Sequence, residues 1–261
     1  MSNSKKKKSS VFINLLIAAV LAVMIFSGYK IFSEIAQKKK EQSAFEQLAQ
    51  QVVVDETEYE DVDIEQLKLE RYAQLKEKNP HFVGWIRIDG TKLDYPVVHT
   101  PANPEYYLRR AFDGSYAISG TPFVGAGCTV DSKNLMIYGH RMNNDTMFTV
   151  LLDYADKAFW EEHREIQFDT VEKLQTYEVV SAFYITIPNE EDPDYAEAFW
   201  WAEYGGDIEG EEWDYYVQQV KARSYYDTGI EILDDDKLLT LTTCAYNSDE
   251  QRFVVVARLK Q

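Results

Sequence analysis

The sequence is poor in cysteine and histidine. Its 261 residues include two cysteines, Cys128 and Cys244, and four histidines. Two thiols do not make the disulfide framework of a small secreted domain, which uses cysteines in larger even numbers. Cys128 and His140 also lack the paired close spacing of zinc ligands. We therefore expect no metal and no cofactor, and a lone thiol outside the cytoplasm should be either buried or functional.

Basic charge is scarce outside the N-terminus. Residues 51–261 hold 41 of the 44 acidic residues but only 19 of the 27 basic ones. A nucleic-acid or polyphosphate partner requires a basic face, and the sequence shows neither a glycine-rich phosphate loop nor an internal repeat. The composition therefore argues against a nucleic-acid partner. It is compatible with a basic or amine-bearing partner, although acidity often serves solubility alone.

One long apolar run is present near the N-terminus. Residues 11–29, VFINLLIAAVLAVMIFSGY, carry no formal charge and follow the KKKK of residues 5–8. As a helix this run is roughly 28 Å long, enough to cross the hydrocarbon core of a bilayer. A cleaved signal peptide has a shorter apolar region and a small-residue cleavage site. We favour an uncleaved signal anchor, with a cleaved signal or a buried helix as the alternatives.

The anchor divides the sequence into four predicted parts: a basic cytoplasmic tail at residues 1–10, a transmembrane anchor at 11–32, a juxtamembrane helix and linker at 33–57, and a folded domain at 58–261. Lysines flank both ends of the apolar run, so the positive-inside rule does not fix its orientation. Because no foldable segment precedes the anchor, we expect a single-pass cell-membrane protein with an extracellular domain. A cytoplasmic domain is the alternative.

Short β-rich segments dominate the sequence after residue 82. Gly, Pro, Asn and Asp separate them, as is typical of strands joined by turns. Seven or so such segments in about 180 residues predict a mostly β fold with one closed or nearly closed barrel. The predicted strands are 82–90, 92–100, 134–140, 164–170, 175–187, 237–245 and 252–259.

Helical patterns lie before the strands and within them. Residues 34–79 are predicted to be helical, with the acidic VVVDETEYEDVD of residues 52–63 as a bend or linker. An acidic, aromatic insertion occupies residues 189–229, and its apolar residues recur at helical spacing at Trp213, Tyr216, Val217 and Val220. We interpret this insertion as a helix packed on the barrel or as the wall of a substrate groove.

Cys244 ends one predicted strand and Arg252 begins the next. Strand alternation places Thr240, Thr242 and Cys244 on one face. If the polar residues 245–251 connect the two strands as neighbours, the thiol and the guanidinium lie side by side at one end of the sheet. A packed thiol beside a rim arginine is the structural alternative.

His140 completes a possible reactive set, because NLMIYGH at residues 134–140 also ends a strand. Attack on a carbonyl requires a thiolate, which a neighbouring imidazolium stabilises. The imidazolium can then protonate the leaving amine, and a permanently charged guanidinium can bind the oxyanion. The other three histidines, His81, His99 and His163, are predicted to be surface or packing residues.

At this point the residues resemble a known family. TLTTC at residues 240–244 is similar to the TLxTC signature of sortases, the membrane-anchored cysteine transpeptidases of Gram-positive bacteria. The segments VGWIRIDGTKLDYPVV, YYLRRAFDGSY and MFTVLLDY resemble class B sortases in particular. The resemblance implies an eight-stranded β-barrel with N-terminal helices at residues 45–80 and a helix in the loop before the cysteine strand. It also implies that residues 58–261 are a catalytic domain.

The resemblance implies a reaction as well. Cys244 would attack the Thr carbonyl of a C-terminal sorting motif, His140 would act as general acid and base, and Arg252 would hold the substrate carbonyl or oxyanion. Thr242 and Thr243 would line the groove and bind substrate. An amine of the peptidoglycan cross-bridge or of lipid II would then resolve the thioester. The expected partners are surface proteins with an NPQTN-like motif or an SPxTG- or PPxTG-like motif.

Two other functions stay open. A cysteine endopeptidase would use the same three residues and let water resolve the thioester. A membrane-anchored acidic binding or scaffold domain would carry them incidentally. One departure from class B sortases is Cys128, which we interpret as either a buried small apolar residue or an exposed second thiol.

Overall fold

The structure is a computed structural model. It describes residues 3–54, 62–187, 189, 191, 198–244 and 251–260, with the backbone alone at residues 3–12 and at Cys244. The chain divides into two compact units, residues 1–44 and residues 45–261.

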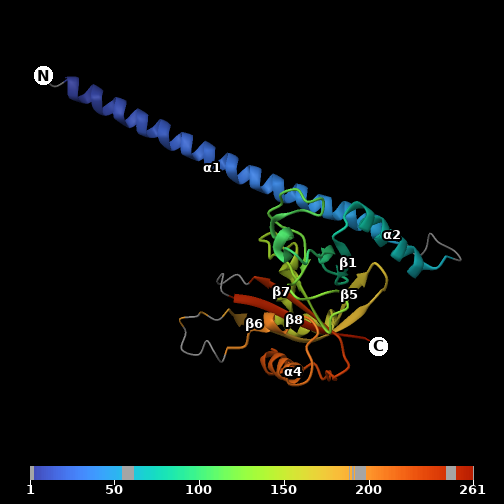
Figure 1. Ribbon diagram of the computed structural model, residues 1–261. Coiled ribbons are helices and arrows are strands. Elements are labelled where there is room, and N and C mark those ends of the chain that lie inside the picture. The colour runs from blue at the N-terminus through green and yellow to red at the C-terminus, as the bar shows by residue number, and fades with distance from the viewer. Residues whose placement is uncertain are drawn as a thin grey trace. The chain divides into compact units, whose positions relative to one another are not determined.

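Eight strands and several helices make up the described residues (Figure 1). The helices are α1 (Asn3–Val52), α2 (Ile64–Lys78), α3 (Lys157–Glu162) and α4 (Glu211–Arg223), with 3-10 helices η2 (Pro104–Arg109), η3 (Phe148–Ala155) and η5 (Trp201–Tyr204). The strands are β1 (Phe82–Arg87), β2 (Asp94–Val98), β3 (Phe123–Val124), β4 (Asn134–Tyr138), β5 (Glu165–Thr170), β6 (Thr176–Thr186), β7 (Leu238–Cys244) and β8 (Gln251–Leu259).

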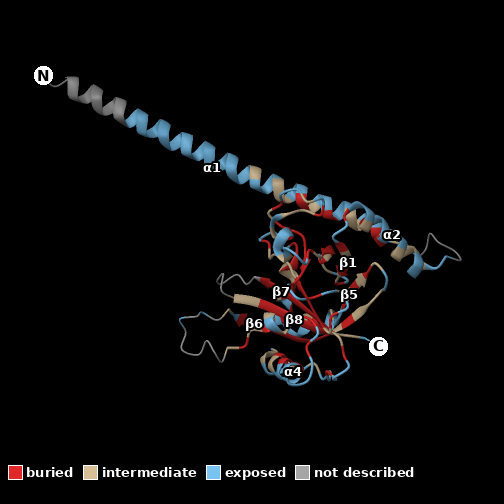
Figure 2. Ribbon diagram, viewed as in Figure 1, coloured by how far each residue is buried: buried red, intermediate tan, exposed pale blue. Residues whose placement is uncertain are grey.

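The predicted anchor lies inside α1. The helix is continuous from Asn3 to Val52 and contains no proline. Side chains at residues 13–32 are all exposed (Figure 2), and α1 is long and apolar enough to cross a membrane by length and composition. The predicted boundary at residues 32 and 33 therefore falls within one helix. Residues 55–57, the end of the predicted linker, lie outside the described residues.

The strands close into a barrel in the order β1-β2-β3-β4-β7-β8-β6-β5. Neighbours are antiparallel except β2 with β3 and β4 with β7, which are parallel. The barrel confirms the predicted fold class and the eight strands that the resemblance implies, although the residue pattern alone indicated seven or so and missed β3. A strand of two residues has no alternation to detect. Phe123 and Val124 pair with Tyr138 and Ile137 and so bridge β2 to β4.

The insertion covers the outer face of the barrel beside β6 and β7. In α4 the side chains of Trp213, Tyr216 and Val220 are buried, as their helical spacing predicts. The Tyr216 hydroxyl lies 2.7 Å from Thr240 Oγ1 on β7. The Ser181 hydroxyl on β6 donates to the Val220 carbonyl at 2.6 Å. The prediction of a helix packed on the barrel is confirmed.

Strand β8 lies between β7 and β6 in the barrel. Phe253 to Ala257 are all buried (Figure 2), which requires cover on both faces of the strand. Burial of this apolar surface is the main stabilising contribution in a domain of this size. Strand β8 is therefore held firmly between β6 and β7, and its first residues are positioned by the core.

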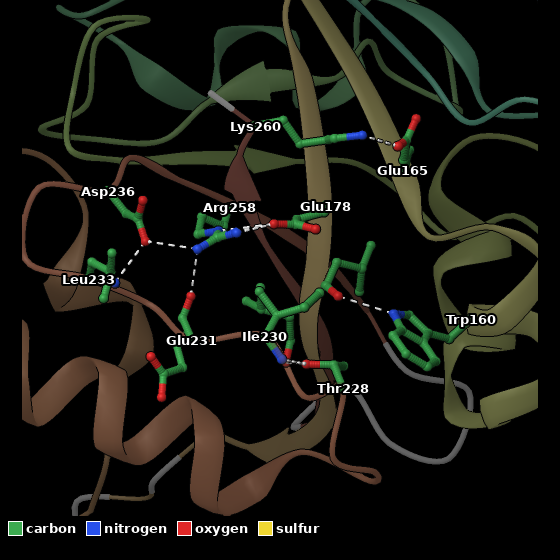
Figure 3. A network of polar contacts seen from close by, with 12 residues as sticks. Trp160, Glu165, Glu178, Thr228, Ile230, Glu231, Leu233, Asp236, Arg258 and Lys260 are labelled. Atoms are coloured by element: carbon green, nitrogen blue, oxygen red, sulfur yellow. Dashed lines mark hydrogen bonds and ion pairs between the residues drawn. The ribbon is translucent and has the colours of Figure 1, made fainter.

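A polar network holds the C-terminal end of β8 (Figure 3). Arg258 donates from Nε to Glu178 Oε1 at 3.1 Å and from Nη1 to the Glu231 carbonyl at 2.8 Å. Its Nη1 also lies 3.6 Å from the buried Asp236 carboxylate, which accepts the Leu233 amide at 2.7 Å. The network ties residues 231–236, which lead into β7, to strands β6 and β8.

Candidate active site

Strands β7 and β8 bring Cys244 and Arg252 opposite each other. Their antiparallel register pairs Thr242 with Val254, Thr243 with Phe253 and Cys244 with Arg252. The predicted pairing of the two strands is therefore observed. The connecting residues 245–250 lie outside the described residues, as does the Cys244 side chain.

His140 lies at the same end of the neighbouring strand. Strand β4 runs parallel to β7, with Ile137 opposite Leu241 and Tyr138 opposite Thr242. The Gly139 amide continues this ladder by donating to the Thr242 carbonyl at 3.2 Å. His140 lies two residues beyond Tyr138, the last residue of β4, and Cys244 is the last residue of β7, so both lie toward the same end of these parallel strands. Because adjacent strands are about 4.8 Å apart, we expect His140, Cys244 and Arg252 to lie near one another at this end.

The imidazole of His140 has a defined partner. Its Nε2 lies 2.7 Å from the Leu108 carbonyl at the end of η2. Burial lowers the pKa of His140, the Leu108 carbonyl acts in the opposite direction, and the Arg109 guanidinium lowers the pKa further. The neutral imidazole is therefore favoured, which suits a group that must accept a proton from a thiol.

Arg252 is half-buried at the start of β8. Its Nη1 donates to the Gln251 carbonyl at 3.0 Å. Burial raises the pKa of Tyr138 on β4, and Arg252 counteracts this increase through its positive charge. The positive charge of Arg252 thus reaches Tyr138, the last residue of β4. A fixed positive charge at this place can bind a developing oxyanion.

Thr242 and Thr243 are both buried. Thr242 is on the same face of β7 as Cys244, and its Oγ1 accepts a hydrogen bond from Trp201 Nε1 at 3.1 Å. Thr243 points to the opposite face, and its Oγ1 has no hydrogen-bond partner among the described residues. Direct contact of either side chain with substrate stays a prediction.

The second thiol is part of the core. Cys128 is 3% exposed, its Sγ lies 3.6 Å from the Asn134 carbonyl, and burial raises its pKa. A protonated, inaccessible thiol is a poor nucleophile. Of the two interpretations of Cys128, the buried small apolar residue is confirmed.

The other three histidines have surroundings of their own. His81 Nδ1 lies 3.1 Å from the Tyr107 hydroxyl. Burial and the Lys76 charge lower the pKa of His99. His163 follows α3 and its ring packs at a tilt against that of Phe159, with centroids 4.4 Å apart. His81 is exposed, and His99 and His163 are half-buried, as expected of surface or packing residues.

The sequence did not point to Leu108. Its contribution is a backbone carbonyl, which every residue type offers, so no side-chain pattern marks it. The segment YYLRRAFDGSY was quoted only for its resemblance to class B sortases. The structure shows that this segment contacts His140.

Known proteins resemble the chain over nearly its whole length. Sortase B of Staphylococcus aureus strain NCTC 8325 is 27% identical over 259 residues, covering 95% of this chain and 96% of that protein. Sortase B of Listeria monocytogenes strain EGD-e is 29% identical over 251 residues, covering 92% and 93%. No protein-family model matches the chain.

The fold resembles solved sortase B structures as well. A Staphylococcus aureus sortase B–substrate complex superposes with a TM-score of 0.71 at 27% identity, covering 87% of this chain and 99% of the other. The likeness thus includes the eight-stranded barrel and extends over both sequences. The similarity in sequence and in fold supports a class B sortase.

Proposed function

We propose that the chain cleaves a C-terminal sorting motif after its threonine and transfers the protein to an amine of the cell wall. The observation that carries this proposal is the register of three adjacent strands. It pairs Cys244 with Arg252, and it leaves His140 two residues beyond the end of β4, on the side where β7 ends at Cys244. A nucleophile, a proton carrier and a fixed positive charge at one strand end are the groups that acyl transfer requires.

The first half-reaction forms a thioester. His140 accepts the Cys244 proton, and the thiolate attacks the threonine carbonyl of the motif. The carbonyl oxygen becomes an oxyanion beside the Arg252 guanidinium, which carries its charge at any physiological pH. As the tetrahedral intermediate collapses, the C–N bond breaks and the imidazolium of His140 gives its proton to the leaving amine.

The second half-reaction reverses these roles. A primary amine of the peptidoglycan cross-bridge or of lipid II attacks the thioester, and His140 accepts its proton. The C–S bond breaks, a new amide forms, and Cys244 recovers its proton. The acidic surface of residues 51–261 favours the approach of an amine-bearing acceptor over a polyanion.

Helix α1 supports a proposal for the cellular location of the protein. We propose that residues 11–32 anchor the chain in the cell membrane as a single span, with residues 1–10 in the cytoplasm and residues 33–57 as the juxtamembrane segment. The catalytic domain, residues 58–261, then works on the outer side, where sorting motifs and wall amines meet. The exposed apolar side chains of residues 13–32 support the span.

A transfer assay tests the proposal. Full-length protein in detergent is incubated with peptides carrying NPQTN-like, SPxTG-like or PPxTG-like motifs, with and without triglycine as the amine. We expect cleavage after the threonine. A new amide product should form only when triglycine is present. The Cys244→Ala variant should give no product, and Cys128→Ser should remain active. Cleavage with the same rate and the same products with and without triglycine would indicate an endopeptidase. Activity in Cys244→Ala would refute the mechanism.

A further inference from the structure

We propose that the segment from residue 104 to residue 121, here the support loop, is a positioning element for His140. In this proposal the Leu108 carbonyl fixes Nε2 as the protonated ring nitrogen, Gly120 keeps that carbonyl in place, and Nδ1 is left to exchange the proton with Cys244 and the substrate amine. The catalytic part of this inference rests on the proposed function, while the hydrogen-bond geometry stands on its own.

The tautomer follows from the chemistry of the two atoms. His140 Nε2 lies 2.7 Å from the Leu108 oxygen. A carbonyl oxygen can only accept, so Nε2 must carry the hydrogen in both the neutral and the charged ring. In the neutral imidazole the lone pair is then on Nδ1. The nitrogen that accepts the thiol proton is therefore determined by a backbone group outside the three reactive side chains.

Hydrogen bonds on both sides of Leu108 fix its carbonyl within the support loop. The Tyr107 carbonyl accepts the Thr121 amide at 3.1 Å, and the Arg109 carbonyl accepts the Ala117 amide at 3.1 Å. The Arg109 guanidinium also donates to the Ile118 carbonyl at 2.7 Å. Hydrogen bonds thus connect the two ends of the support loop. Leu108 lies between Tyr107 and Arg109, whose carbonyls both accept such bonds.

Gly120 is the point at which a side chain would disturb this arrangement. Its φ is +61°, and a Cβ there would lie 2.5 Å from the Leu108 oxygen and 2.9 Å from the Tyr107 oxygen. Distances this short require the carbonyls to move, because both belong to the backbone. Glycine at position 120 therefore allows the Leu108 oxygen to remain where His140 Nε2 reaches it.

Charged and titratable groups lie on several elements around this end of the barrel. Arg109 of the support loop acts on His140, Arg141 follows His140 in sequence, and Cys244 and Arg252 are paired residues of β7 and β8. The Leu108 carbonyl favours the imidazolium while Arg109 disfavours it. Displacing the Leu108 carbonyl removes the contact that stabilises the imidazolium and leaves the Arg109 charge that destabilises it. The rate of proton exchange through this ring should therefore fall more than the affinity for substrate.

The test compares two glycines of the same loop. Gly114 also has a positive φ, +82°, but a Cβ there would have Tyr106 Oη as its nearest neighbour at 4.0 Å. Gly114→Ala therefore carries the same kind of backbone strain without contacting Leu108. We expect Gly120→Ala to lower kcat at least about tenfold with a much smaller change in KM, and Gly114→Ala to keep kcat within about threefold. Thermal melting confirms that both variants fold.

A second measurement does not depend on activity. Long-range nitrogen–proton NMR spectra of histidine-labelled full-length protein in detergent, at about pH 8 where the ring is neutral, report which nitrogen carries the proton. His140→Gln identifies the signals. We expect the Nε2–H tautomer in the wild type and in Gly114→Ala, and its loss in Gly120→Ala.

Two results would overturn the proposal: an Nδ1–H tautomer in the wild type, or a Gly120→Ala variant that matches Gly114→Ala in both kcat and tautomer. If Gly120→Ala does not fold, the wild-type tautomer still decides. Failure of the proposed function would appear separately, as activity retained in Cys244→Ala with the Nε2–H tautomer intact.

Discussion

At the scale of single residues, the environment of His140 determines how it can work. Burial and the Arg109 charge lower its pKa, while the bond to the Leu108 carbonyl raises it. A group that is mostly neutral near pH 7 is ready to accept a proton, and the same ring becomes a strong acid once it is protonated. The low pKa therefore suits both halves of an acyl transfer.

The first prediction concerns the titration of His140. We expect a pKa below the ordinary histidine value of about 6.5, measured by NMR of the labelled ring. Arg109→Gln should raise it slightly, because an exposed charge is strongly screened. Arg110→Gln, the matched control, should leave it unchanged. A pKa above the ordinary value would show that burial does not dominate.

The lowered pKa of His140 also makes the free energy of unfolding depend on pH, and linkage gives the direction of this dependence. Folding favours the neutral ring, so the unfolded chain binds the proton first as the pH falls. The contribution of His140 to the free energy of unfolding is therefore complete above the ordinary pKa. It decreases as the pH falls from there toward the lower pKa of the folded state. Wild type and His140→Gln should differ in this interval of pH.

The second prediction concerns Arg252. A lysine keeps the charge but loses the planar, multiply donating guanidinium. We expect Arg252→Lys to lower kcat/KM about a hundredfold, the usual cost of losing one oxyanion donor, with little change in the melting temperature. Steady-state kinetics with a motif peptide and triglycine give the ratio. Full activity in Arg252→Lys would mean that the guanidinium does not act on the reacting carbonyl.

At the scale of elements, α4 supports the strand that carries Cys244. The Thr240 hydroxyl donates to Asn134 Oδ1 at 2.8 Å, so the Tyr216 hydroxyl must donate to Thr240 at 2.7 Å. This chain of bonds links α4, β7 and β4. Trp201 of η5 adds a bond to Thr242 on the same face. The insertion thus fixes two of the three strands that end at the site.

The third prediction tests this support. Tyr216→Phe removes one buried hydrogen bond and should lower the free energy of unfolding by about 1 kcal/mol, measured by denaturant titration. The neighbouring Tyr215 is 37% exposed, and Tyr215→Phe should change stability by less than about 0.5 kcal/mol. Equal effects of the two substitutions would show that the bond to β7 contributes nothing specific.

At the scale of the whole molecule, the two ends of β8 have different structural and functional roles. Its first residues, near Arg252, belong to the candidate site, while Arg258 at the other end belongs to the network of Figure 3. The buried middle of the strand separates them. Changes at the distal end should therefore affect stability without affecting the reaction.

The fourth prediction tests whether the end of β8 at Arg258 affects stability alone. Arg258→Met leaves the buried Asp236 carboxylate without its guanidinium neighbour and should cost about 2 kcal/mol of unfolding free energy. Lys260→Met removes an exposed ion pair with Glu165, which solvent screens, and should cost much less unfolding free energy. Both variants should keep kcat when assayed well below their melting temperatures. A loss of kcat in Arg258→Met would mean that the two ends of β8 are coupled.

Much of this architecture is predictable because it follows local patterns. Alternation of side chains along residues 238–244 and 252–259 was enough to place Cys244 beside Arg252, and helical spacing identified α4. The parallel pairing of β4 with β7 is different, because it joins segments about a hundred residues apart and leaves no local signal. The strand β3 was unpredictable because two residues show no alternation. The role of Leu108 was unpredictable because every residue offers a backbone carbonyl.

Site-specific alkylation tests the central claim most directly, namely that His140 activates the Cys244 thiol. Full-length protein and His140→Gln are treated with iodoacetamide across a pH series, and peptide mapping measures modification of Cys244 and Cys128. We predict rapid modification of Cys244, a much slower reaction in His140→Gln near neutral pH, and protection of the buried Cys128 in both. Equal Cys244 rates in the two proteins would contradict the account.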